Sequence, residues 1–273
     1  MPLHFNSITN DCNNAQRLAY LLQKGIEKVD YIFVSKDQQY VLLLNNIYDE
    51  KTGETLGKFV YTIKILDKSL NIIDMDIIWE NRCPTKLYFN KLLDGSSESN
   101  EYYEVYTLPE QQHLNVETVN RHIIDTPIID TDRDVYISVF PFELSVFDDI
   151  FEFNSWAGFK TPIVAGPTDI KVAGFAETFI MPLSTSKSNA EDDEHCSLIL
   201  GKVCSFREVE FAIGEEIISF ILAQVETALG VVTTAMSRDV FDLSKFKNGC
   251  IVAMKADIKV NFATDKDYKK ARA

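Results

Sequence analysis

An aspartate and a lysine stand two residues apart in the segment GCIVAMKADIKVNF, where apolar and polar side chains alternate. They are Asp257 and Lys259. Alternate residues of a strand point to the same face, so this spacing predicts that the carboxylate and the ammonium group lie side by side. Such a carboxylate can hold Mg²⁺ while the lysine orients a water molecule for attack. A second acidic ligand is required, and Asp239 and Asp242 are the candidates.

The same pattern has a structural explanation. An acid-x-Lys strand element occurs in metal-dependent nucleases, but a three-residue pattern alone is weak. Alternating aspartate and lysine on a solvated sheet face needs no function, because cross-strand charge pairs stabilise sheets. We therefore expect Asp257 and Lys259 to be structural and solvated, with a metal-dependent hydrolase or nuclease as the alternative. No metal and no other cofactor is predicted.

Two further groups resemble known chemistry and fall short of it. His195 and Cys196 are adjacent, but the preceding AEDDE would raise the pKa of the thiol, whereas a nucleophilic cysteine needs positive surroundings. Asp130, Asp132 and Asp134 match the front half of a calcium loop, yet the glycine and glutamate that complete it are missing. Motifs for zinc, phosphate loops and serine hydrolases do not occur, so no motif names a reaction.

Aromatic residues in FNSWAGFKTPIVAGP offer a candidate binding surface. Trp156 and Phe159 could line a pocket or contact a partner, and the alternative is that they anchor the loop in the interior. With no catalytic motif and an acidic balance, the leading hypothesis is a non-catalytic protein-binding or assembly component. Its partner would be another protein of unknown identity. A small-molecule binding module is the third possibility.

Charge and composition limit the partners and the compartment. The formal net charge of −14 disfavours nucleic acid and anionic membrane surfaces, which bind through lysine and arginine. The N-terminus lacks the pattern of a signal peptide, and no apolar stretch reaches the roughly 18 residues of a membrane span. The cysteines are five in number and scattered, which favours reduced thiols. A cytoplasmic location is expected.

The elements that must position these residues suggest a strand-rich α+β protein, with antiparallel sheets and a few helices. Ala15, Leu18, Ala19 and Leu22 predict a short helix, and about four strands follow it. Residues 94–112 are rich in serine and glutamate and predict a linker or long loop. The predicted organisation is therefore an N-terminal helix and β-meander at 1–93, the linker, and a C-terminal α+β domain at 113–273.

The most apolar stretch of the chain, GEEIISFILAQVETALG, decides the expected shape of the C-terminal part. Its apolar residues cover a broad arc of a helical wheel, and strand alternation fails because apolar groups fall on both faces. Glu215 and Glu216 suit a helix N-terminus, and Gly230 suits the position after the last turn. The sequence predicts a helix at 215–229 within a β-α-β-β unit, packed on the sheet through Ile217, Ile221 and neighbouring apolar residues.

Overall fold

Strands dominate the protein, whose structure is a computed structural model. It describes residues 29–66, 69–81, 84–94, 96, 101–108, 112–158, 176–183, 195–213 and 216–263. Strands make up 65% of the described residues and helices 5%. The predicted α+β class with a few helices was therefore wrong. The helix predicted at 15–22 lies outside the described residues.

The first sheet is an antiparallel meander of four strands in the order β1-β2-β3-β4. Its members are β1 (Tyr31–Val34), β2 (Tyr40–Tyr48), β3 (Thr55–Leu66) and β4 (Ser69–Trp79). Successive side chains of β3 point to opposite faces of the sheet, as a strand requires. Phe59 and Tyr61 pack in one apolar cluster, and Val60 packs in another. The two pairs of strands predicted before residue 93 are confirmed by the β1–β2 and β3–β4 registers.

The second sheet has nine strands and mixes parallel with antiparallel pairs. Its strands are β5 (Thr85–Leu92), β6 (Glu101–Thr107), β7 (His113–Thr118), β8 (Thr131–Phe147), β9 (Phe179–Pro182), β10 (Ser197–Ile213), β11 (Glu216–Thr227), β12 (Gly230–Met236) and β13 (Ile251–Phe262). A short 3-10 helix, η2 (Arg121–Ile123), follows β7, and the α-helix α2 (Ile150–Trp156) follows β8. The predicted linker 94–112 contains β6, which pairs with both β5 and β7. The division into two parts stays a prediction.

A central ribbon of β8 and β13 organises the nine strands. These two strands pair antiparallel from Val135 to Phe147. On the outer edge of β8, β5 binds the first part of the strand and β12 binds at Ser138 and Val139. On the outer edge of β13, β10 pairs with the first part of the strand and β7 pairs at Lys259 and Val260. The remaining pairings, β5–β6–β7 and β10–β11–β12, close two circuits of five strands that share the ribbon.

The predicted helix at 215–229 is the strand β11, and this prediction was wrong. Both faces of β11 are covered: Phe220 packs toward the four-stranded sheet, whereas Ile221 and Val225 lie in the core of the nine-stranded sheet. A strand that is buried on both sides is apolar along its whole length. In sequence, such a run resembles a helix with a broad apolar face. Gly230 does not end a helix but begins β12 with φ of 85°, a value that favours glycine. Ile217, expected to be buried, is 62% exposed.

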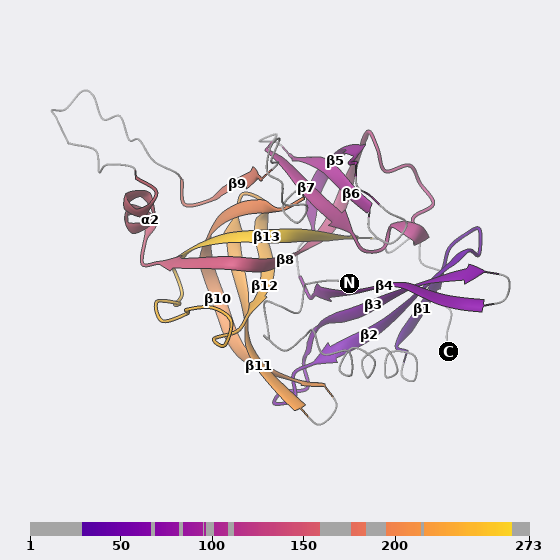
Figure 1. The fold of residues 1–273 in the computed structure, drawn as a ribbon, viewed down its shortest axis with the longest axis horizontal. Coiled ribbons are helices and arrows are strands. Elements are labelled where there is room, and N and C mark those ends of the chain that lie inside the picture. Colours follow the sequence, from indigo (N-terminus) through magenta and orange to yellow (C-terminus); the bar gives the residue numbers. More distant parts are fainter. Residues whose placement is uncertain are drawn as a thin grey trace.

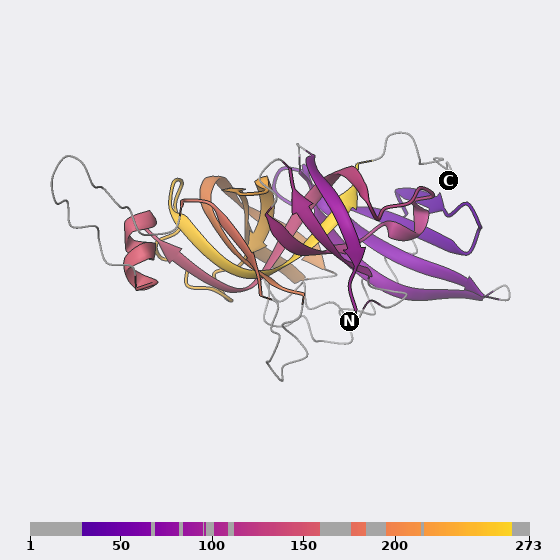
Figure 2. The same cartoon turned by 90° about the horizontal axis from the view of Figure 1, so that it is seen from above.

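The four-stranded sheet forms one end of the molecule and α2 lies at the other (Figures 1 and 2). One face of this sheet packs on β8, β10, β11 and β12 through a cluster that includes Phe59, Phe140 and Phe211. Its opposite face contacts the segment after β7 through Val119 and Ile123. Among the described residues, no helix is long and apolar enough to cross a membrane.

Candidate functional site

The face of β13 that carries Asp257 and Lys259 is covered rather than solvated, contrary to the expectation from sequence. Lys259 is only 1% exposed and Asp257 is partly buried. Side chains at alternate positions, such as Met254 and Ile258, fill the core on the other side of the strand. The covering elements are β7, which pairs with β13 at Glu117, and β4 of the other sheet, which reaches Lys259 through Asp76.

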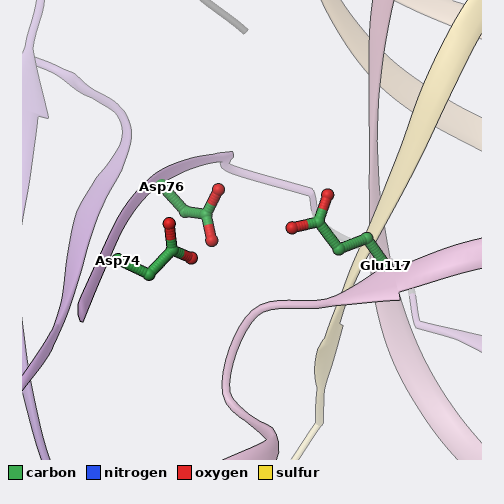
Figure 3. A group of neighbouring side chains, drawn as sticks. All are labelled: Asp74, Asp76 and Glu117. Carbon is green, nitrogen blue, oxygen red and sulfur yellow. The ribbon is translucent and has the colours of Figure 1, made fainter. Parts of the chain in front are cut away.

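Lys259 is the centre of a buried group of carboxylates, which we call the Lys259 cluster: Lys259, Asp74, Asp76 and Glu117. The ammonium group donates to Asp76 Oδ1 and lies 3.1 Å from Glu117 Oε1. Asp76 and Glu117 are each 3% exposed. Figure 3 shows that Asp74 and Asp76 extend from β4 toward Glu117. One oxygen of each carboxylate lies within 4.8 Å of the other two.

Burial raises the pKa values of two of these acids. The pKa of Asp74 rises to about 8, first because the side chain is buried and then because the charge of Asp76 is close. The pKa of Glu117 rises to about 7, again through burial, although the charge of Lys259 opposes the rise. Burial alone would lower the pKa of Lys259, but the charges of Asp76, Glu117 and Asp74 outweigh it and hold this pKa above its usual range.

The raised pKa values lower the negative charge of the Lys259 cluster near neutral pH. Asp76 pairs with the ammonium, and Asp74 and Glu117 hold protons more readily than exposed acids do. Three convergent carboxylates could hold a divalent cation, but the Lys259 ammonium already contacts two of them. A metal would have to displace a buried lysine from its partners. The arrangement therefore fits an internal ion cluster that joins the two sheets better than it fits a catalytic metal centre.

Asp257 takes part in a separate contact on the same strand face. Cys196 Sγ donates to Asp257 Oδ1 at 3.2 Å, and the His195 ring stacks on Tyr102 with centroids 4.0 Å apart. Burial raises the pKa of Asp257, against the effects of the Cys196 hydrogen bond and of the Lys259 charge. Cys196 is 3% exposed. A buried thiol that donates to a carboxylate is poorly placed to become a nucleophilic thiolate.

The acids that sequence reasoning proposed as partners of Lys259 lie elsewhere. Asp239 and Asp242 are exposed in the segment between β12 and β13, and Asp242 Oδ1 accepts a bond from Ser244 N at 3.0 Å. Neither belongs to the convergent carboxylates, whose members come from β4 and β7. Sequence reasoning missed these acids. The available signal was the pair of acids in NIIDMDIIW, a segment that is otherwise almost entirely apolar.

The aromatic residues proposed for binding lie at the far end of the molecule. Trp156 ends α2 and is 68% exposed, and Phe151 on the same helix is 67% exposed. Phe153 is buried and meets Phe147 edge to face, with ring centroids 5.3 Å apart. Phe159 lies outside the described residues. The helix thus presents two large aromatic side chains to solvent while a third anchors it.

Three contacts fix the orientation of α2. The Asp149 side chain caps its N-terminus and accepts bonds from the backbone N–H groups of Phe151 and Glu152, both at 2.9 Å. Lys245 and Lys247, from the segment before β13, pair with Glu152 and Asp148. The position of the exposed aromatic residues is therefore set by local structure rather than by a partner.

Comparison with other proteins adds no family to this description. No protein-family model matches the chain, and neither curated proteins nor solved structures give a significant match.

Proposed function

We propose that the protein is a non-catalytic protein-binding component and that the exposed aromatic residues of α2 are its contact surface. The observation that carries this proposal is the exposure of Phe151 and Trp156, each about two thirds accessible on one short helix. Large aromatic side chains are the residues most enriched at the energetic centres of protein interfaces. A single exposed apolar residue is ordinary, but two exposed aromatic residues on one anchored helix favour a partner.

The anchoring of α2 supports the same proposal. Because Phe153, the Asp149 cap and the pairs with Lys245 and Lys247 already hold the helix, a partner would not need to order it. Contact residues that are ordered before binding cost less conformational entropy when the complex forms.

Charge favours a partner of a different kind over a second copy of the chain. Two copies would each bring a net charge of −14 and repel one another. The partner that suits this surface is a protein with an apolar pocket and a basic rim. Among the described residues, Cys196, Cys204 and Cys250 form no disulfide, which is in keeping with a cytoplasmic location, and that location belongs to this proposal.

The alternative of a metal-dependent hydrolase has weaker support. It needs Asp257 and Lys259 beside a metal, but Lys259 is engaged by Asp76 and Glu117 in the interior. Asp257 accepts a hydrogen bond from Cys196.

Site-specific crosslinking in cells tests the protein-binding proposal. A photoreactive residue at position 156 or 151 should capture one and the same protein, identified by mass spectrometry. The matched control is position 70 on β4, because Leu70 is also 68% exposed. With that partner purified, Trp156→Ala should weaken binding by about 30-fold, as for an interface residue worth about 2 kcal/mol. Leu70→Ala should not. Equal capture from all three positions, or none from 151 and 156, would overturn the proposal.

A further inference from the structure

A groove runs between the four-stranded sheet and the β8–β13 ribbon, at the opposite end of the molecule from α2. It encloses about 500 Å³ and adjoins a second hollow of about 250 Å³. Lys58, Ile78, Tyr136 and Asn261 line both hollows, so they mark the place where the two meet. A volume of this size is typical of sites for small organic ligands.

Three polar side chains reach this junction from different strands. Lys58 comes from β3, Tyr136 from β8 and Asn261 from β13, where Asn261 and Tyr136 are direct cross-strand neighbours. Within the described part of the chain, no carboxylate pairs with Lys58, and its ammonium group lies over the Tyr31 ring, 5.3 Å from the ring centroid. In the same part, neither the Tyr136 hydroxyl nor the Asn261 carboxamide has a hydrogen-bond partner. All three can therefore donate to a ligand.

Lys58 and Lys259 show why the groove is a candidate site and the interior cluster is not. Lys259 is fully buried and two carboxylates already use its charge. Lys58 is half-buried and keeps its charge available. A partly desolvated ammonium beside two neutral donors is suited to an anionic oxygen group.

The remainder of the larger hollow is mostly apolar. Its wall comes from β1, β2, β3 and β4 of the four-stranded sheet and from the end of β13: Phe33, Leu42, Leu44, Val60, Ile78 and Phe262. At its border stands Asp134, whose exposed carboxylate adds negative charge to an already acidic chain. A ligand with several negative charges would be repelled there, whereas a ligand with one would gain from Lys58.

We infer that this groove binds a small amphipathic monocarboxylate. The carboxylate group lies between Lys58, Tyr136 and Asn261, and the aromatic or aliphatic body lies on the apolar wall at the partly exposed Phe33 and Leu44. This binding activity is independent of the α2 surface, so either proposal can fail while the other stands.

The test uses the full chain and 3-phenylpropionate as the probe, followed by ligand-detected and protein-detected NMR. Neutral 3-phenylpropanamide and doubly charged phenyl phosphate are the matched ligands. Lys58→Met should weaken 3-phenylpropionate binding by about tenfold, the effect of one charge-assisted hydrogen bond, and leave the amide unaffected. Tyr136→Phe, which removes only the hydroxyl group, should weaken the carboxylate by roughly two- to fivefold. Lys247→Met at the other end of the molecule should change nothing.

The location of binding is tested at the same time. Signals of Leu44 and of the Asn261 side-chain amide should shift with 3-phenylpropionate, while those of Phe147 should not. Lys58→Arg should keep most of the affinity, which separates loss of charge from loss of fold. Absence of binding at millimolar 3-phenylpropionate would overturn the inference, and so would occupation of the groove by another part of this chain that no probe displaces. Equal weakening of acid and amide by Lys58→Met, or tighter binding of phenyl phosphate, would also overturn it.

Discussion

Lysine–carboxylate pairs occur in two contrasting settings in this molecule, one between the two sheets and one beside α2. In the Lys259 cluster, the side chains of Lys259, Asp76 and Glu117 are between 0% and 4% exposed. Beside α2, the side chains of Lys245 and Lys247 are 47% and 60% exposed. The functional groups are the same, so the difference between the settings lies in access to water. Water screens the outer pairs, while the inner group has only its own members to compensate its charges.

This contrast separates structural chemistry from surface chemistry. The Lys259 cluster connects β4 of one sheet to β7 and β13 of the other, so its charges must be satisfied whenever the two sheets are assembled. The pairs beside α2 orient a helix that water would solvate in any case. Asp257 and Lys259, whose spacing suggested chemistry from the sequence, serve mainly the structural chemistry of the interior.

Removing the buried cation should have the largest effect. Lys259→Met leaves Asp76 and Glu117 in the interior without a cation, and we expect a loss of about 3–5 kcal/mol in the free energy of unfolding. Urea denaturation followed by circular dichroism measures it. Lys247→Met is the control at the exposed end and should leave the unfolding free energy nearly unchanged. Equal losses in the two variants would show that burial does not distinguish the two settings.

A companion variant separates the lost cation from the altered shape. Asp76→Leu combined with Lys259→Met removes the opposing charge as well, and should recover part of the loss because a buried pair can be replaced by apolar groups at little cost. No recovery would mean that the sheets depend on the shape of these side chains more than on their charges.

The same contrast between buried and exposed positions applies to the apolar residues of β11. Ile221 is 1% exposed and Ile217 is 62% exposed. Ile221→Ala should cost about 2–5 kcal/mol in the free energy of unfolding, whereas Ile217→Ala should stay within about 0.5 kcal/mol. Thermal melts of the two variants measure the difference. A helix at 215–229 would bury both residues, so similar losses would contradict the strand.

Sequence reasoning was most successful where one face of a strand differs from the other. In β3 the apolar Tyr61 and Ile63 alternate with the polar Thr62 and Lys64, which indicates a strand although Val60 on the second face packs in another apolar cluster. Sequence reasoning failed for β11, where layers on both sides remove the polar face that marks a strand. Among the site residues, Trp156 is 68% exposed, and its role as a contact residue stays a prediction.

The partners of Lys259 could not be found in the same way. Asp76 is 183 residues away in the sequence, and a different sheet carries it to the cluster. The two-residue spacing of Asp257 and Lys259 fixed only that they share a face of β13. Whether that face meets water or another sheet is decided by tertiary packing, which leaves no local trace in a strand of alternating polar residues.

Titration of the two settings should differ in sign and should change stability gradually over several pH units. Folding raises the pKa values of Glu117 and Asp74 to about 7 and about 8, so the folded state holds protons that the unfolded chain has already released. Stability should therefore fall as pH rises from about 5 to about 8.5, by at most about 1.4 kcal/mol per pH unit for each group. At the exposed end, hydrogen bonds from Lys247 and Lys245 lower the pKa values of Asp148 and Glu152, and that contribution is lost as pH falls.

Glu117→Gln isolates the buried part of this pH dependence. The amide cannot titrate, so the decline in stability between about pH 5 and pH 7 should become shallower, while the part of the decline that belongs to Asp74 should remain up to about pH 8. Glu152→Gln is the matched control and should alter only the acidic side of the profile, because the pKa of Glu152 lies below its ordinary value. Urea unfolding at half-unit steps from pH 4 to pH 9 gives both curves. If Glu117→Gln leaves the profile above pH 6 unchanged, Glu117 is already ionised throughout this range. Burial would then not raise the pKa of Glu117, contrary to the description of the Lys259 cluster.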